Sequence, residues 1–359
     1  MDIPDTITKR EILSHPAALA GALAAVERQA EALLGLWRRR TYRRVMFTGC
    51  GSTHYLSLGA ARVFEDLTGV PSRGIPAGEF LLCPSLIPHA SAGPTLLVAV
   101  SRSGTTSETV RAAAAFAKAG AGDVVAITAQ PGDGPRDLAN VLVNIPEAKE
   151  ESVAQTRAFS AMWLAACMLA ALISGDDRLQ AELRKAPGWS AKIIDAAKDR
   201  AMALGADLSF DRIYYLGSGH RYGLASEGGL KMKEMTLTHA EPFHFLEFRH
   251  GPKSMVTEST LIAALVSDDA DGREAAVLKE VQGLGAHLFV LGERASDAFG
   301  DHGISFHSGL GEIGRSVLFL PPLQLLALGR AAAKGLNPDQ PKNLSAVVYL
   351  DDGRPMPNW

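Results

Sequence analysis

Two stretches of the chain, offset by 168 residues, share one pattern: a short apolar run, a glycine-rich turn and then a helical pattern. In the first copy Val45–Thr48 leads into Gly49-Cys-Gly-Ser-Thr, and in the second Ile213–Leu216 leads into Gly217-Ser-Gly-His. Further apolar runs repeat at nearly the same spacing, at 95–101 with 260–267 and at 123–128 with 287–291. A strand–helix–strand–helix–strand unit used twice is the economical explanation.

The repeated strands are continuous apolar runs, not alternating ones, which is typical of parallel strands that helices cover on both faces. We therefore predict an α/β fold with two tandem domains, each a parallel sheet flanked by helices in a flavodoxin-like three-layer sandwich. The expected bounds are 30–180 and 205–350, joined by 176–206, with a helical segment at 1–29 and a tail at 351–359.

Charge and composition exclude several classes of protein. The 36 Lys and Arg residues against 39 Asp and Glu give a net charge of -3, whereas a general nucleic-acid binder carries a clustered basic excess. With 47% apolar and 21% charged residues the chain is not disordered. Three scattered cysteines, Cys50, Cys83 and Cys167, cannot build a disulfide framework, so a cytoplasmic location is expected.

Neither export nor a membrane span is expected. Residues 1–10 are polar and lack the pattern of a signal peptide. The longest apolar stretch, 159–173, is shorter than the roughly 20 residues of a spanning helix. A buried core helix or a dimer-interface helix is the better interpretation.

Residues 101–106, Ser-Arg-Ser-Gly-Thr-Thr, follow a buried strand and precede the helical pattern of Val110–Ala119. Thr105 and Glu108 have the spacing of a capping box, which predicts that the helix begins at Thr105. A helix start offers free N–H groups and a positive dipole end. Hydroxyls at 101, 103 and 106 would converge there to hold a phosphate without a metal, although an ordinary Ser/Thr-rich turn explains the pattern equally well.

No nucleotide cofactor is expected. The turn at Gly49 lacks the third glycine of a dinucleotide fingerprint, and the turn at Gly217 has its next glycine, Gly223, one residue late. A P-loop sequence is absent as well.

Ionisable side chains gather in the second copy. Glu227, Lys231 and Glu234 share one face of the expected helix. Such a triplet is usually a solvated, salt-bridged face. The segment that follows, 239–252, nevertheless combines three histidines and two glutamates with aromatic and leucine side chains, which is typical of a functional site.

Metal and hydrolase chemistry are disfavoured in this segment. It contains no His-Glu-x-x-His, and His239 and His244 are one residue too far apart for one helical face. No Gly-x-Ser-x-Gly elbow follows a strand, although Gly217-Ser-Gly219 superficially suggests one.

These motifs together resemble the sugar isomerase (SIS) family. The resemblance is closest to the duplicated isomerase half of glucosamine-6-phosphate synthase and to shorter relatives that include amino-sugar-phosphate deaminases and deglycases. It covers nearly the whole chain, from the Lys-Arg-Glu-Ile of 9–12 onward. Six motifs carry it in family order: GCGST (49–53), SRSGTTSET (101–109), ESVAQTRAF (151–159), LASEGGLKMKE (224–234), HAEPFHFLEFRHGP (239–252) and PDQPKNL (338–344).

The resemblance implies roles for individual residues. Glu234 matches the base that moves a proton between C1 and C2 of the opened sugar, Glu227 a glutamate near that base, and His250 the ring-opening histidine supplied across a dimer interface. The remaining matches are implied to bind substrate. Those of the phosphate cradle and its neighbours are Ser101, Arg102, Ser103, Thr106, Ser52 and Thr53. Val153 and Gln155 match the contacts to the sugar hydroxyls, and Ser345 belongs to the carboxy-terminal loop.

The chain departs from the family pattern in two places. Ala346 stands where the family usually has a lysine, so electrophilic help would come from His250, Lys342, Arg102 or solvent, or be absent. Asp2 follows Met1 directly, where the synthases have the cysteine of a glutaminase domain, so glutamine-dependent ammonia transfer is not expected.

The leading hypothesis is an isomerase or deaminase of an amino-sugar or keto-sugar 6-phosphate that works through an enediol or enolamine. It would use no metal or cofactor and would act as a homodimer with shared sites. The alternative is a phosphosugar-binding protein that has lost turnover. A DNA-binding regulator is disfavoured, because the stretch before Arg44 is too short for a helix-turn-helix domain.

Overall fold

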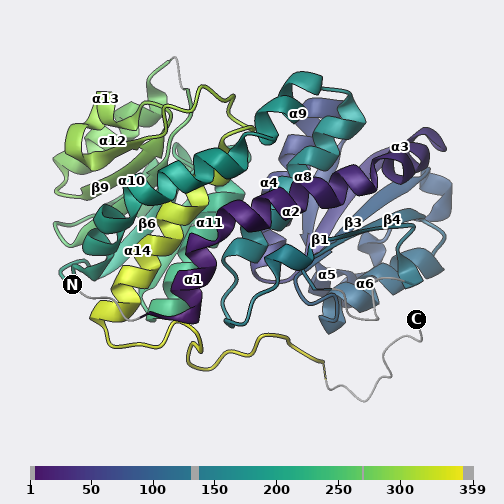
Figure 1. Ribbon diagram of the computed structural model, residues 1–359, viewed down its shortest axis with the longest axis horizontal. Helices are drawn as coiled ribbons and strands as arrows, with labels where there is room; N and C mark the ends of the chain where they lie inside the picture. Colours follow the sequence, from purple (N-terminus) through teal and green to yellow (C-terminus); the bar gives the residue numbers. More distant parts are fainter. Residues whose placement is uncertain (1–4, 131–136, 269–270, 351–359) are drawn as a thin grey trace. The chain divides into compact units, whose positions relative to one another are not determined.

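The computed structural model describes residues 5–130, 137–268 and 271–350 (Figure 1). The chain divides into two compact units. We call them the first-sheet unit, which comprises residues 16–150, 157–184 and 345–359, and the second-sheet unit, which comprises 1–15, 151–156 and 185–344. Each unit therefore contains short pieces of chain that are remote in sequence from its main part.

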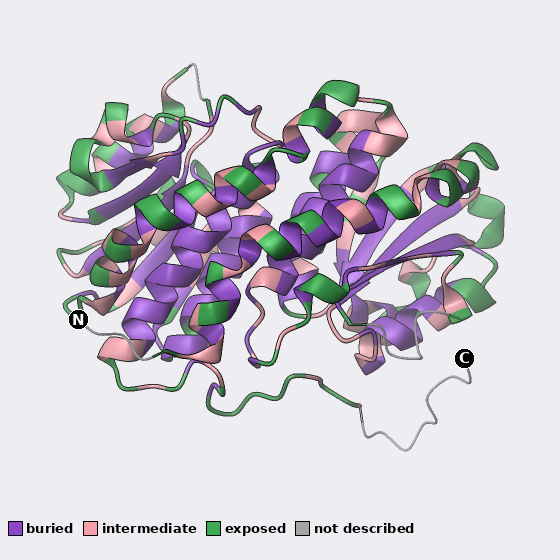
Figure 2. Cartoon of the chain, in the orientation of Figure 1, coloured by how far each residue is buried: buried purple, intermediate pink, exposed green. Residues whose placement is uncertain are grey.

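A five-stranded sheet forms the centre of the first-sheet unit. All its neighbouring strands pair in parallel, in the order β2-β1-β3-β4-β5. The inner strands are buried along their length (Figure 2), as continuous apolar runs predict. The strands are β1 Arg44–Gly49, β2 Ser72–Pro76, β3 Thr95–Ser101, β4 Gly122–Thr128 and β5 Val141–Asn144.

Helices cover both faces of this sheet. Figure 1 shows α4 and α8 on one side of the strands and α5 and α6 on the other, and the members of each pair contact one another. The helices of the unit are α2 His15–Arg28, α3 Ala30–Arg38, α4 Ser52–Thr68, α5 Ala77–Leu82, α6 Ser107–Lys118, α8 Arg157–Ser174 and α9 Asp177–Leu183.

The second-sheet unit repeats this architecture. Its parallel sheet has the order β10-β9-β8-β6-β7, which is the order of the first sheet when it is read from β7. The strands are β6 Arg212–Leu216, β7 His239–Phe243, β8 Thr260–Leu265, β9 His287–Gly292 and β10 Gly303–Ser305. The helices are α1 Ile7–Leu13, α10 Ala186–Ala206, α11 Arg221–Thr236, α12 Arg273–Gly283, α13 Ala295–Phe299 and α14 Leu320–Ala333.

The prediction of two parallel α/β sheets flanked by helices is confirmed, and all six predicted strands are present. The run 260–267 is strand only as far as Leu265. The edge strands β2 and β7 escaped prediction because their residues alternate between exposed and buried or are half-buried. The tail expected at 351–359 lies outside the described residues.

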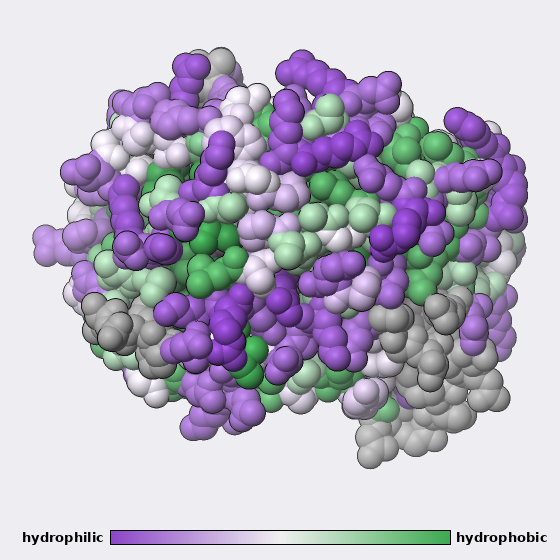
Figure 3. All heavy atoms as spheres, viewed as in Figure 1, coloured by the Kyte–Doolittle hydropathy of each residue, from purple (hydrophilic) through white to green (hydrophobic). Residues whose placement is uncertain are grey.

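Two helical stretches, Arg157–Ser174 and Ser316–Ala333, are long and apolar enough to cross a membrane by length and composition alone. They are 78% and 89% buried inside the protein, however, as core helices of a globular unit are. Trp163 of α8, for example, is fully buried. The face in Figure 3 presents mainly hydrophilic side chains with apolar areas between them.

Two glycines allow α10 and α14 to pack closely. A Cβ atom on Gly205 would lie 2.0 Å from the carbonyl oxygen of Leu326, and one on Gly329 would lie 2.2 Å from that of Met202. Backbone atoms cannot move aside as a flexible side chain can. We therefore expect Gly205→Ala to lower the free energy of unfolding, measured by urea denaturation, by about 1–3 kcal/mol.

Gly188→Ala is the matched control in the same helix. A Cβ there meets no atom within 4 Å, so its stability should be unchanged or raised by up to about 1 kcal/mol. Equal stabilities of the two variants would contradict the close helix contact.

Candidate active site

The strand order of the first sheet fixes where a ligand can bind. In the order β2-β1-β3-β4-β5 the chain reverses its direction of growth between β1 and β3, and ligands of such sheets bind beyond the carboxyl ends of these two strands. The turn at 49–53 follows β1 and the loop at 101–106 follows β3. Both sequence-predicted loops therefore lie at this switch point.

The hydroxyls of the 101–106 loop converge, as expected. Ser101 Oγ donates to Thr106 Oγ1 over 3.3 Å, and Ser103 Oγ lies 3.5 Å from the same atom. Ser101 Oγ also accepts from the backbone N–H of Gly104, whose φ of 71° turns the chain back on itself. Three hydroxyls thus meet at the start of α6.

The predicted capping box at Thr105 is wrong. Helix α6 begins at Ser107 with Thr106 as its N-cap, and no side-chain hydrogen bond caps it within the described part of the chain. Both the backbone N–H and the hydroxyl of Thr105 donate to Ser103 Oγ, at 3.1 Å and 3.2 Å, which holds Thr105 in the loop. The first N–H groups of α6 are therefore not taken up by an N-cap side chain, a state that suits an anion.

The turn after β1 uses its threonine internally. Thr53 Oγ1 accepts from the Cys50 backbone N–H and donates to the Cys50 carbonyl, both at 2.9 Å. Ser52 and Thr53 are buried at the start of α4. Burial raises the pKa of the Cys50 thiol to about 11, so the thiol is protonated at neutral pH. The Thr53 hydroxyl of this turn is therefore already hydrogen-bonded within the turn.

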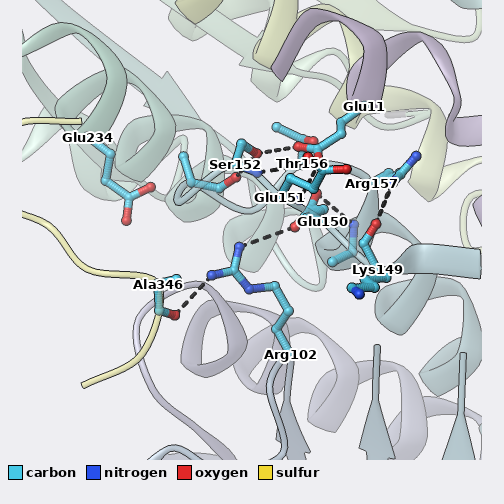
Figure 4. A network of polar contacts seen from close by, with 12 residues as sticks. Glu11, Arg102, Lys149, Glu150, Glu151, Ser152, Thr156, Arg157, Glu234 and Ala346 are labelled. Atoms are coloured by element: carbon cyan, nitrogen blue, oxygen red, sulfur yellow. Dashed lines mark hydrogen bonds and ion pairs between the residues drawn. The ribbon is translucent and has the colours of Figure 1, made fainter. Parts of the chain in front are cut away.

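Arg102 connects the loop to two other parts of the first-sheet unit (Figure 4). Its guanidinium lies 3.4 Å from Glu150 Oε2 and donates to the Ala346 carbonyl over 2.9 Å. Glu150, whose side chain is fully buried, also accepts from the Ala158 N–H at the start of α8. The exposed Ser345 beside Ala346 donates to the carbonyl of Val347 instead.

Glu150 was not among the predicted site residues. The only sequence signal was its position next to the motif that begins at Glu151, because its partner Arg102 is 48 residues away along the chain.

The ionisable triplet of α11, Glu227, Lys231 and Glu234, is mostly buried and is not a solvated face. Lys231 Nζ lies 3.3 Å from Glu227 Oε1 and also bonds Glu234 Oε2. Burial lowers the pKa of Lys231, but the two carboxylates raise it by more, so that it lies above its ordinary value of 10.5. The side chains of Lys231 and Glu227 are 1% exposed and that of Glu234 is 19% exposed, so only Glu234 is accessible to a substrate.

The histidines of 239–252 are not gathered at one point by any contact that the structure records. His239 lies 3.5 Å from Glu241, and His244 stacks on Tyr222 with 4.0 Å between ring centroids. His250 is exposed and ends a 3₁₀ turn. Among residues 5–130, 137–268 and 271–350, no three His, Cys, Asp or Glu side chains are placed to hold a metal ion.

Val153 and Gln155 belong to the short segment of the second-sheet unit at 151–156. The Val153 N–H donates to the Asp339 carbonyl over 3.0 Å. Gln155 Oε1 is buried and has no hydrogen-bond partner among the described residues.

Two acidic residues that received no predicted role hold this segment and the amino terminus. Glu11 accepts from the Glu151 N–H over 2.6 Å and from the Ser152 hydroxyl (Figure 4). Asp339 accepts from the N–H groups of Ile7 and Thr8, at 3.0 Å and 2.7 Å. Both lie in sequence motifs of the resemblance, at 9–12 and 338–344, which was the available signal.

The family model described as "SIS domain" matches residues 40–172 and 209–302, one segment for each sheet. The chain belongs to the SIS domain family. This confirms the resemblance.

Curated relatives of this SIS protein include glutamine–fructose-6-phosphate aminotransferases (isomerizing). That of Gloeobacter violaceus is 30% identical over 322 residues, which cover 86% of this chain and 52% of the relative. That of Methanothermobacter thermautotrophicus is 28% identical over 319 residues, again 86% and 52%. The chain spans about half the length of the curated relatives that it matches.

Solved structures of similar chains include glucosamine-6-phosphate deaminase of Thermotoga maritima, with a TM-score of 0.80 and 26% identity, covering 96% of this chain and all of the other. Tagatose-6-phosphate ketose/aldose isomerase of Escherichia coli has a TM-score of 0.83 at 24% identity, covering 93% and 95%, and shares the fold.

Lys231 should be essential for stability. Lys231→Met removes the cation beside the buried Glu227, so we expect the free energy of unfolding at pH 7, measured by denaturant, to fall by about 3–5 kcal/mol. In the wild type the contribution of Lys231 is complete below pH 10.5, its ordinary pKa, and is lost only as the pH rises through the higher folded value.

Lys233→Met is the matched control, because Lys233 lies on the same helix and is exposed. It should change stability by no more than about 0.5 kcal/mol. A Lys231→Met protein as stable as this control would show that the buried ion triplet does not form.

Proposed function

We propose that this SIS protein converts an amino-sugar or keto-sugar 6-phosphate, as an isomerase or as an amino-sugar-phosphate deaminase. The observation that carries the proposal is the meeting of three hydroxyls at the start of α6, at the switch point of the first sheet. The solved deaminase and isomerase neighbours, which act on sugar 6-phosphates by their names, support this substrate class.

The phosphate is assigned to Ser101, Ser103 and Thr106 together with the first N–H groups of α6. Hydroxyls and the N–H groups of a helix start can bind one phosphate by hydrogen bonds, which agrees with a chain that has no large basic excess. Arg102 is assigned to position this loop, since its guanidinium already bonds Glu150 and the Ala346 carbonyl. The phosphate would orient a substrate whose reacting carbons are remote from it.

Glu234 is assigned as the base. Lys231 fixes its carboxylate from the buried side, and its partial exposure leaves the other side accessible. Glu227 is too deeply buried for that role and is assigned to hold Lys231. A single carboxylate removes the proton from C2 of the open-chain aldose and returns it to C1, while the proton of the C2 hydroxyl passes to O1, and the aldose becomes a ketose through an enediol.

With an amino group on C2 the same proton transfer passes through an enolamine and yields an imine at C2. Water adds to the imine carbon, and the C–N bond then breaks to release ammonia and leave the keto sugar. His250 is assigned to proton transfer between the ring oxygen and a hydroxyl during ring opening, as the family resemblance suggests. Val153 and Gln155 are assigned to the sugar hydroxyls.

Two further assignments follow the family resemblance. We propose that the protein acts in the cytoplasm as a homodimer with shared sites, the exposed His250 of one chain serving its partner. Sedimentation equilibrium tests the dimer directly.

Glucosamine 6-phosphate should release ammonia and form fructose 6-phosphate, and unphosphorylated glucosamine should not. Glu234→Gln should lower kcat by about 100-fold or more, because the amide cannot accept the C2 proton. Glu258→Gln, a change at an exposed glutamate of the same unit, is the control and should retain full activity. Full-rate exchange of the C2 proton with deuterated water in Glu234→Gln would exclude Glu234 as the base.

A second candidate, a phosphosugar-binding protein without turnover, is favoured by Ala346, where the family usually has lysine. It would bind sugar 6-phosphates, detected as a rise in Tm, without any C2 proton exchange. Ala346→Lys distinguishes the two: for a disabled enzyme the change should create or raise exchange. A fall in activity would instead identify an enzyme adapted to a site without that lysine.

A further inference from the structure

The second sheet has a switch point of its own that the proposed function leaves unused. Its strand order matches that of the first sheet, so the corresponding place lies beyond the carboxyl ends of β6 and β8. The turn at 217–221 follows β6, and the residues after β8 lead to the start of α12 at Arg273. These are the counterparts of the loops at 49–53 and 101–106.

A carboxylate of the chain itself occupies this place. Glu274 Oε2 accepts from the Ser267 backbone N–H over 2.7 Å and from the Ser267 hydroxyl over 3.0 Å. Glu274 Oε1 accepts from Arg221 Nη2 over 3.0 Å. A backbone N–H after the strand, a hydroxyl and a guanidinium are the donors that hold an oxyanion in proteins.

The contact between Arg221 and Glu274 is buried and is not a surface ion pair. Arg221 is 6% exposed and Glu274 9% exposed. The other terminal nitrogen of Arg221 bonds Glu312 over 2.9 Å, and its Nε is buried without a hydrogen-bond partner among the described residues. Helix α12 starts at Arg273 with Gly272 as its N-cap, and no side-chain hydrogen bond caps it within the described part of the chain.

The corresponding positions of the two units carry different side chains. The offset of 168 residues places Arg221 opposite Thr53, whose hydroxyl bonds the backbone of Cys50 in the same turn. In the first-sheet unit the loop after β3 contains hydroxyls that bond one another. In the second-sheet unit an arginine and a carboxylate of the chain itself lie at the two corresponding points.

We propose that the second-sheet unit retains an oxyanion site at its switch point, and that Glu274 fills this site in place of a phosphate. The ligand that the site would take without the Glu274 carboxylate is a tetrahedral oxyanion, such as inorganic phosphate. The duplicated chain then binds one phosphosugar and not two, a conclusion that rests on the proposed function of the first-sheet unit.

Equilibrium dialysis of the full chain against labelled inorganic phosphate tests the proposal. Glu274→Ala should bind one more phosphate per chain than the wild type at the same free concentration. Glu274→Gln retains the volume of the side chain and should bind no more than the wild type. The double variant Glu274→Ala/Arg221→Met should lose the additional phosphate, because its guanidinium donor is gone.

The measured quantity is the difference from the wild type, so it is independent of whether the 101–106 loop binds phosphate. Failure of that loop would lower the wild type and the variant equally and would concern only the proposed function. A folded Glu274→Ala protein that binds as much phosphate per chain as the wild type overturns the proposal that Glu274 fills an oxyanion site. So does an additional phosphate that persists in the double variant.

Stability provides a second measurement if the alanine variant folds poorly. Glu274→Ala and Glu274→Ser leave Arg221 buried without this carboxylate, so phosphate should raise their Tm by more than that of the wild type, compared with chloride at equal ionic strength. Recovery of folding in phosphate alone supports the proposal. Equal Tm shifts in all three proteins, or failure to fold in both salts, count against it.

Discussion

Parallel strands that helices cover on both faces leave polar groups one place to gather, which is the ends of the strands. In each sheet of this protein the inner strands are buried along nearly their whole length, and the hydroxyl contacts of the 101–106 loop begin where β3 ends. The repeated strand order then creates the same opening in both units. What differs between the copies is the set of side chains placed at that opening.

Buried charges in this protein are balanced by several partners and not by one. Lys231 lies between two carboxylates, and Arg221 likewise bonds Glu274 and Glu312. Burial raises the pKa of Glu312, yet the bond from the Asp268 N–H and the charges of Arg221 and Arg315 lower it by more. Such clusters stabilise a charge that a single partner could not keep buried, and they fix the orientation of each carboxylate.

The sequence was sufficient where the signal is local and continuous. The six inner strands and the helices at 52–68 and 221–236 follow from apolar runs and glycine turns. The edge strand β2 could not be found this way, because only Ile75 of its residues is buried. A strand on the edge of a sheet needs no continuous apolar run.

The candidate site was predictable in the same uneven way. The meeting of hydroxyls at 101–106 depends on neighbours in sequence and was foreseen. The bond between Arg102 and Glu150 joins residues 48 positions apart, and that between Arg102 and Ala346 spans 244, so only the folded chain shows them. The predicted helix start at Thr105 was wrong because the spacing of a capping box takes no account of the bonds that the Thr105 N–H and hydroxyl donate to Ser103.

Each unit contains pieces of chain from the other half of the sequence. Residues 5–15 and 151–156 fold with the second sheet, where Glu11 and Asp339 hold them, whereas residues 345–350 fold with the first. A cut in the connection before β6 would therefore separate each sheet from a segment that folds with it. Neither copy of the repeated architecture is therefore contained in one continuous stretch of the chain.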